Sequence, residues 1–138
     1  MRTLLSLTLI LGITLLISCK QEQKNESINP TIIYGGGDII TMQGDSPEYT
    51  EALVVRGNEI LFVGSLKDAK SNADEGYKYI DLEGNTLLPG FIDGHGLEKG
   101  KLADMVILNK NPLKVQEEDI KKILVLETIK EGVSVYKK

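Results

Sequence analysis

Histidine and cysteine, which commonly bind metals or carry covalent groups, occur once each in this sequence, as His95 and Cys19. Asp93 lies two residues before His95, so both side chains point to the same side if this segment is extended. One histidine and one carboxylate make a poor metal site, because catalytic zinc normally has three protein ligands. The sequence also contains no pattern of nucleophile, base and orienting group around them. We therefore predict no catalytic residue in this chain alone, and a turn or core role is the simpler interpretation of His95.

Cys19 follows a segment that is typical of an exported protein. Arg2 precedes an apolar stretch at 4–17, which is shorter than the roughly 20 residues of a membrane-spanning helix. The stretch ends in Leu-Ile-Ser-Cys at 16–19, which resembles the lipobox of bacterial lipoproteins. We predict a helical signal peptide at 1–18 and lipidation of Cys19, since several acyl chains anchor a protein stably. The alternative is an uncleaved anchor in which the cysteine is incidental.

Residues 19–30 comprise the lipidated cysteine and a polar run that ends in a proline. We predict that this run is a flexible tether. The predicted location is the cell envelope, with the membrane as a partner through the lipid anchor. Lys20, directly after the cysteine, favours the outer membrane of a Gram-negative bacterium over retention in the inner membrane. The formal net charge is −4, and no basic cluster is present, so nucleic-acid binding is not expected.

The remaining residues, 31–138, predict one small domain of mainly β structure. β-prone runs alternate with turn residues such as Gly57-Asn58, which is a two-residue hairpin signal. Strands are expected at 31–34, 38–42, 51–56, 59–63, 78–82, 85–88, 104–108, 123–130 and 133–136. A short helix is expected at 65–73 with Ser65 as its cap, and one helical turn at 116–122. This spacing predicts a small β-sandwich or barrel and argues against βαβ units.

The run Gly35-Gly36-Gly37 has the glycine content of a phosphate-binding loop. It lacks the lysine and the following helix that such a loop requires. We therefore expect a turn between two strands at this point. No cofactor is expected in this chain.

Several runs resemble the opening of the amidohydrolase superfamily, most closely the branch called amidohydrolase 3. They are Tyr-Gly-Gly at 34–36, the hairpin at 52–60, Ile-Asp-Leu-Glu-Gly at 80–84 and Leu-Pro-Gly-Phe-Ile-Asp-Gly-His at 88–95. Runs at 97–108, 111–113, 125–129 and 132–136 resemble the closing segment of the same family. The resemblance implies that 31–96 and 97–138 are the N-terminal and C-terminal halves of one β-sandwich. Intact members carry a metal-bearing TIM barrel beside this sandwich.

The resemblance also implies what this chain lacks. The whole barrel is absent between Gly96 and Leu97, and Leu97 stands where the family has a second metal-binding histidine. His95 matches a family metal ligand by position, but the family's bridging lysine, later histidines and metal-binding aspartate belong to the absent part. Intact members use a divalent, zinc-like metal to hydrolyse non-peptide carbon–nitrogen bonds. We expect neither that metal nor that activity in this chain alone.

Three hypotheses for the function follow from these observations. The first is a truncated, lipid-anchored amidohydrolase that keeps the β-sandwich and is inactive as a single chain. The second is a sandwich subunit that completes a separate barrel chain in trans, and the third is a binding or scaffolding lipoprotein. Without a barrel, Phe91 and Ile92 are expected to face water. Such an apolar face favours self-association or a barrel partner.

Overall fold

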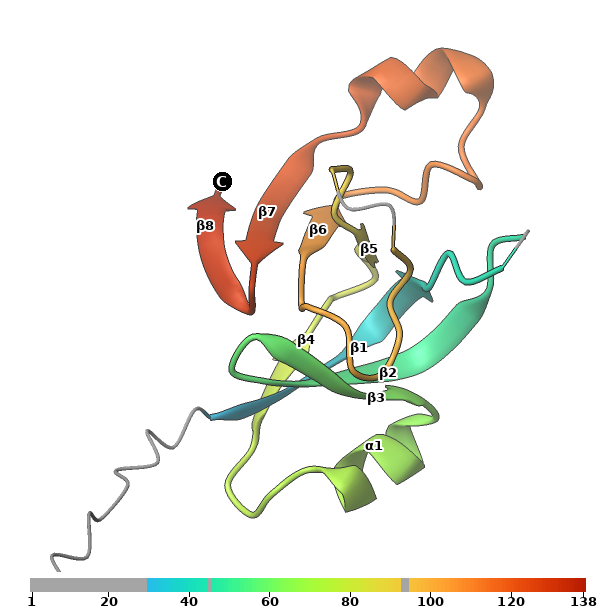
Figure 1. Cartoon of the computed structure of the whole chain (residues 1–138). Helices are drawn as coiled ribbons and strands as arrows, with labels where there is room; N and C mark the ends of the chain where they lie inside the picture. The colour runs from blue at the N-terminus through green and yellow to red at the C-terminus, as the bar shows by residue number, and fades with distance from the viewer. Residues whose placement is uncertain (1–29, 45, 93–94) are drawn as a thin grey trace, which may run out of the picture.

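The structure of the protein is a computed structural model that describes residues 30–44, 46–92 and 95–138. The predicted signal peptide, Cys19, the tether before Pro30, and Asp93 lie outside these residues. The described part forms, in chain order, β1 (Thr31–Ile40), β2 (Tyr49–Arg56), β3 (Glu59–Gly64), α1 (Leu66–Asn72), β4 (Lys78–Asp81), β5 (Thr86–Pro89), β6 (Met105–Leu108), the 3-10 helix η1 (Glu117–Lys122), β7 (Val125–Lys130) and β8 (Val133–Lys137) (Figure 1). The expectation of a mainly β fold is confirmed. Neither helix in the described part is long and apolar enough to cross a membrane.

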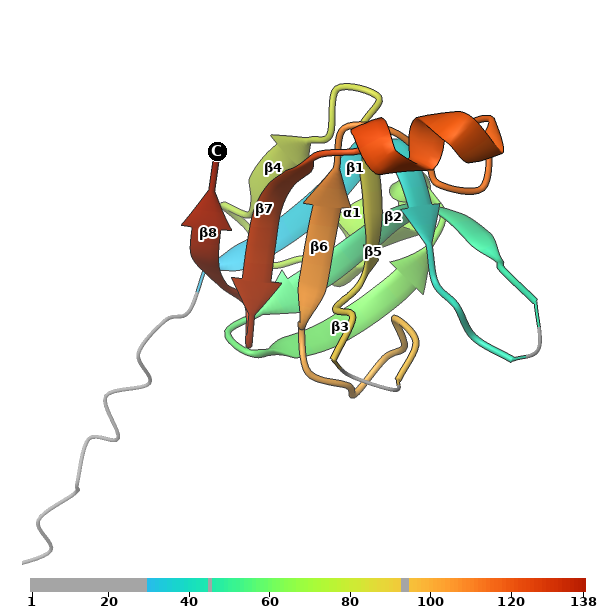
Figure 2. The ribbon, with the colours of Figure 1, turned by 90° about the horizontal axis from the view of Figure 1, so that it is seen from above.

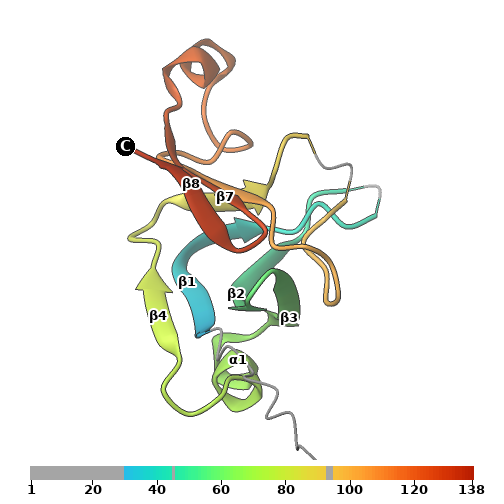
Figure 3. The ribbon, with the colours of Figure 1, turned by 60° about the vertical axis from the view of Figure 1, so that its left-hand side comes forward.

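The strands of the described residues belong to one mixed sheet in which β1 is central. β2 pairs antiparallel along one side of β1, and β3 pairs antiparallel with β2. On the other side, β4 runs parallel to the first half of β1, and β5 runs parallel to its second half. From β5 the sheet continues antiparallel through β6, β7 and β8, which lie side by side in Figure 2. Figure 3 shows that the sheet bends, so that β2 and β3 lie across from β5 and β7.

The main core fills the space between the two parts of this bent sheet. Leu53 and Ile60, from β2 and β3, lie in one buried cluster with Met105 and Ile107 from β6. Burying each such aliphatic side chain contributes about 1.5–3 kcal/mol. Because the cluster contains residues from both sides of the 93–97 segment, the two parts of the chain share one core, as the layers of a sandwich do.

The glycines at 35–37 lie within the continuous strand β1 and bend it. The prediction of a turn between two strands at this point is therefore wrong. The pairing of β1 with β2 shifts register between Gly35 and Ile39, which is the mark of a bulge. A Cβ atom at Gly35 would lie 2.8 Å from Tyr79 Oη, and one at Gly37 would lie 2.7 Å from Leu82 Cβ. The absence of side chains therefore lets β4 and the turn after it approach β1 closely. This approach allows β1 to pair first with β4 and then with β5.

The other predicted elements are present to within a few residues of the expected bounds. α1 begins after Ser65, whose side chain accepts a hydrogen bond from the Asp68 amide at 3.1 Å, as predicted for a cap. Ala69 of this helix is buried with Ile33 and Val54, so α1 covers the outer side of β1 and β2.

Replacing Gly37 with alanine should lower the free energy of unfolding by about 1–3 kcal/mol, because the added methyl group would overlap the Asn85 carbonyl oxygen and Leu82 Cβ. Gly90→Ala is a matched control, since a Cβ atom there would meet only ordinary contacts of 3.5–3.6 Å with Asp104. Denaturant unfolding followed by circular dichroism measures both variants. Equal unfolding midpoints would contradict the crowding argued for Gly37.

Candidate functional site

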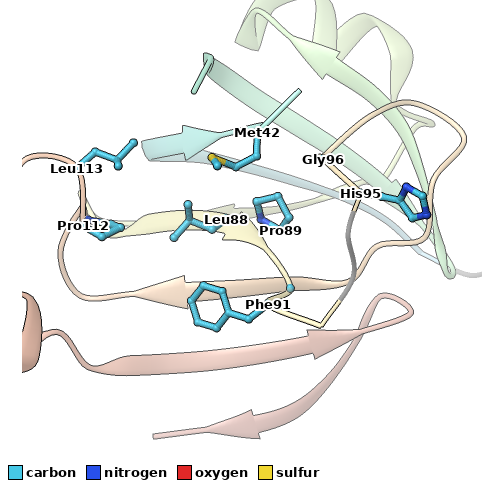
Figure 4. A pocket seen from close by; sticks show the side chains of 9 residues that line it. Met42, Leu88, Pro89, Phe91, His95, Gly96, Pro112 and Leu113 are labelled. Atoms are coloured by element: carbon cyan, nitrogen blue, oxygen red, sulfur yellow. The ribbon is translucent and has the colours of Figure 1, made fainter. Parts of the chain in front are cut away.

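An open hollow of about 440 Å³ lies where β5 ends and the chain turns back toward β6. Its lining consists of Met42, Leu88, Pro89, Gly90, Phe91, His95, Gly96, Pro112 and Leu113. In Figure 4 the apolar side chains of Met42, Leu88, Phe91 and Leu113 gather on one side, and the ring of His95 lies apart from them. The hollow is therefore mainly apolar, and such a lining suits an apolar group.

Leu88 forms the buried floor of this hollow. It packs in one cluster with Ile40 of β1 and with Val106 and Leu108 of β6. Around this floor, the side chains of Phe91 and its neighbour Ile92 are exposed to water, which confirms the expectation from the sequence.

Asn111 holds the wall of the hollow that Pro112 and Leu113 form. The residue is buried, and its Nδ2 donates hydrogen bonds to Asp38 Oδ2 at 2.7 Å and to Tyr49 Oη at 3.1 Å. Its Oδ1 accepts a hydrogen bond from the Leu113 amide at 2.9 Å. Since Asp38 is in β1 and Tyr49 begins β2, Asn111 fixes this wall to the centre of the sheet.

Lys114 adds a positive charge to the same cluster. Its Nζ lies 2.8 Å and 3.0 Å from the two carboxylate oxygens of Asp38, and 5.1 Å from the centroid of the Tyr49 ring. The hydrogen bonds from Asn111 and from Lys114 hold the pKa of Asp38 below its usual value of 3.8. The hydrogen bond to Asp38 raises the pKa of Lys114 above its usual value of 10.5. Sequence reasoning missed this cluster, and only Asn111 carried a signal, through the family resemblance.

Leu97 is a core residue in this structure. Its side chain is buried in the main cluster, and its amide donates a hydrogen bond to the Thr41 carbonyl at 2.7 Å. Its carbonyl accepts a hydrogen bond from the side chain of Gln43. A Cβ atom at Gly96 would lie 2.6 Å from the Thr41 carbonyl oxygen, so this segment passes too close to the end of β1 for a larger residue. Position 97 therefore anchors the segment by packing and offers no side-chain metal ligand.

The described residues do not fit a metal centre. His95 is exposed, beside a polar hollow that it shares with Gln43, Glu98 and Lys101. Within 30–44, 46–92 and 95–138, no group of three or more His, Cys, Asp or Glu side chains is placed to hold an ion. A catalytic zinc normally takes three protein ligands, and the described residues do not supply His95 with the other two. The assignment of His95 as a family ligand position without partners stays a prediction, as does the lipidation of Cys19.

Comparison with known proteins relates this chain to a group of hydrolases. A family model described as "Amidohydrolase family" matches residues 96–136. Imidazolonepropionase from two strains of Porphyromonas gingivalis is 36% identical over 59 residues, which cover 43% of this chain and 13% of that enzyme. A crystal structure of an uncharacterized metal-dependent hydrolase from Pyrococcus furiosus aligns with a TM-score of 0.40 and 26% identity, over 44% of this chain and 13% of that one.

The family match and the enzyme relatives support membership of the amidohydrolase superfamily, and this support covers part of the chain. The resemblance recognised in the sequence is confirmed at that level. The matched region spans only 13% of the length of the curated relatives. The chain is therefore similar to a fragment of an amidohydrolase-family hydrolase.

The contact between Asp38 and Lys114 should make stability depend on pH in the acid range. Because the folded pKa of Asp38 lies below 3.8, its contribution is complete above that value and is lost as the pH falls through the folded pKa. Asp38→Asn should therefore destabilise the protein at neutral pH, and its difference from the wild type should shrink in acid. Denaturant midpoints from neutral pH to below pH 3.8 measure this difference.

Asp119→Asn is the control for this measurement, because Asp119 pairs with Lys122 inside η1. An exposed pair of this kind contributes little to stability. A difference between Asp38→Asn and the wild type that stayed constant with pH would contradict the role given to the Asp38 carboxylate.

Proposed function

We propose that this chain is the sandwich part of an amidohydrolase-family hydrolase, lipid-anchored through Cys19 and inactive as a single chain. In this proposal the metal-bearing barrel of the family is missing between Gly96 and Leu97. The observation that carries the proposal is the direct pairing of β5 with β6, from Thr86 with Leu108 to Pro89 with Met105. The strands before and after the proposed deletion thus pair in one sheet, so the two halves of the sandwich hold together in this chain.

The surroundings of Leu97 support the same proposal. By the sequence resemblance, family members place a metal-binding histidine at this position. Here the position is enclosed in the main apolar core. An imidazole buried there would have to give up its hydration, which costs free energy. A leucine at this position therefore suits a chain whose segment is held by packing and not by a metal.

The placement of catalytic groups in the family supports inactivity. The reaction of intact members is metal-dependent hydrolysis of a non-peptide carbon–nitrogen bond. In TIM-barrel enzymes, the catalytic and specificity residues lie on loops at the carboxyl ends of the barrel strands. A sandwich without those loops binds neither the metal nor the substrate in the family manner. The match to 13% of the length of imidazolonepropionase fits a chain that corresponds to a minor part of such an enzyme.

The proposed anchor places the sandwich in the cell envelope. It rests on the pattern Leu-Ile-Ser-Cys at 16–19 after an apolar stretch, and on the polar residues that follow. Several acyl chains on one cysteine bind a membrane stably, whereas a single chain binds only marginally. Lys20 favours delivery to the outer membrane.

The purified chain should hydrolyse amide and cyclic-amide substrates no faster than buffer does, with or without added Zn²⁺. Metal analysis should find much less than stoichiometric metal, and His95→Ala should behave as the wild type does. Stoichiometric metal that is lost in His95→Ala, together with hydrolysis, would contradict the proposal. Activity that appears only on mixing with a separate barrel chain would favour the subunit hypothesis over the inactive single chain.

Cys19→Ser should abolish incorporation of radiolabelled palmitate and leave the leader uncleaved, because the thiol that carries the lipid is removed. Ser27→Ala, in the predicted tether, is the control and should label as the wild type does. Fractionation of labelled membranes on a density gradient should place the wild type with the outer membrane. Label that persists in Cys19→Ser would rule out the proposed anchor.

A further inference from the structure

Residues 109–124, which connect β6 to β7, form a loop whose two ends are joined, and we call it the 109–124 loop. The Asn109 amide donates a hydrogen bond to the Leu124 carbonyl at 3.1 Å, and the Leu124 amide donates one to Asn109 Oδ1 at 2.8 Å. Surface loops of this length with closed ends are compact units, known as Ω-loops, and they frequently have a function. Because the two ends bind each other, β6 and β7 can stay paired in whatever position the rest of the loop takes.

The 109–124 loop makes few apolar contacts with the sheet. Figure 1 and Figure 3 show that the orange segment after β6 extends away from the strands. The structure describes all of residues 110–124, and Asn111 is the only buried residue among them. Ile123, near the end of the loop, is half-buried against the cluster that contains Ile40 and Leu88. Segments with so few buried apolar contacts open at a lower free energy than the rest of a protein.

Asn111 and Lys114 make the polar contacts between this loop and the sheet. In the described part of the chain, every hydrogen bond from residues 110–123 to another element ends on Asp38 in β1 or Tyr49 in β2. Asn111 is buried and bonds to both strands, whereas the side chain of Lys114 is 60% exposed. An ion pair as exposed as this contributes little, because water and salt screen it. Asn111 is therefore the main polar contact that holds the loop against the sheet.

The position of the 109–124 loop determines whether the hollow at the end of β5 is complete. Pro112 and Leu113 line this hollow, and they directly follow Asn111. The Leu113 amide donates a hydrogen bond to Asn111 Oδ1, so the side chain that binds the sheet also orients this wall. When the contact of Asn111 with the sheet breaks, the wall moves away and the hollow loses that side.

We propose that the 109–124 loop has two positions, one held against the sheet by Asn111 and one released, and that the hollow is complete only in the first. Release breaks the hydrogen bonds from Asn111 to Asp38 and Tyr49 and leaves β6 paired with β7. It also opens η1, because a single short 3-10 helix is not stable without tertiary contacts. Asn111 is thus a positioning residue for the hollow.

Native-state hydrogen exchange of the full chain, followed by mass spectrometry, tests this motion. The amides of Asp119 and Ile123, which bond to carbonyls within the loop, should exchange about tenfold faster than those of β6 or more. Their rates should hardly change in dilute denaturant, since release exposes little surface, whereas the rates in β6 should rise steeply. Equal rates and equal denaturant dependence in the loop and in β6 would overturn the proposal, because the loop would then open only with the whole domain.

Substitutions test whether Asn111 controls the release. Asn111→Ala should raise the exchange rates of the loop amides about tenfold further, because hydrogen bonds to a charged carboxylate and to a tyrosine are lost. Lys114→Met should raise them about threefold or less, because its ion pair is exposed. Asn72→Ala is the matched control, since the Asn72 side chain donates only within α1, to the Asp68 carbonyl, and the loop should exchange as in the wild type.

Unchanged loop rates in Asn111→Ala, or a larger increase in Lys114→Met than in Asn111→Ala, would overturn the role of Asn111. The measurement on the wild type decides between the two-position loop and a fixed one even if a variant fails to fold. None of these readouts depends on lipidation, metal binding or hydrolysis, so their outcome is separate from that of the proposed function.

Discussion

β5 and β6 form the contact on which the rest of the structure depends. The two strands come from parts of the chain that lie on either side of residues 93–97, and their residues are buried without exception. Their side chains enter two clusters, one between the parts of the bent sheet and one that includes Leu88 of the hollow. Because β5 also pairs with β1 and β6 pairs with β7, loss of this contact would divide the sheet and expose both clusters. Burial of apolar area on both faces is therefore what holds the two parts of the chain together.

Two further sets of contacts hold the segments next to β5 and β6 in place. Gly96 lets the segment after β5 pass close against the end of β1, and Leu97 then enters the core. On the other side of the hollow, Asn111 ties the Pro112–Leu113 wall to Asp38 and Tyr49 through buried hydrogen bonds. A satisfied polar network of this kind fixes a loop in one position. The hollow is consequently held in shape from two sides, although Met42, Phe91, His95 and Leu113 of its lining are exposed.

The similarity to the amidohydrolase superfamily covers part of the chain, and it bears on the fold more directly than on activity. Function resides in sites that a fold carries and not in the fold itself. The sandwich-like unit completes its own core from aliphatic side chains, whereas the described residues group no set of metal-ligating side chains. Phe91 and Ile92, which follow β5, are exposed to water in this structure.

The sequence by itself determined the local elements of this protein. Alternating β-prone residues and turn pairs such as Gly57-Asn58 placed the strands to within a few residues, and Ser65 marked the start of α1, because these signals act over a few neighbouring residues. The exposure of Phe91 and Ile92 followed from the family resemblance. Only the tertiary structure decided that Gly35-Gly36-Gly37 bends one strand instead of ending it, because the reason lies in Tyr79 and Leu82 from a later part of the chain. Likewise, Asp38 and Lys114 are 76 residues apart, and no local pattern joins them. Their contact exists because the sheet order brings β1 beside the segment after β6, and that order is set by which apolar faces can be buried together.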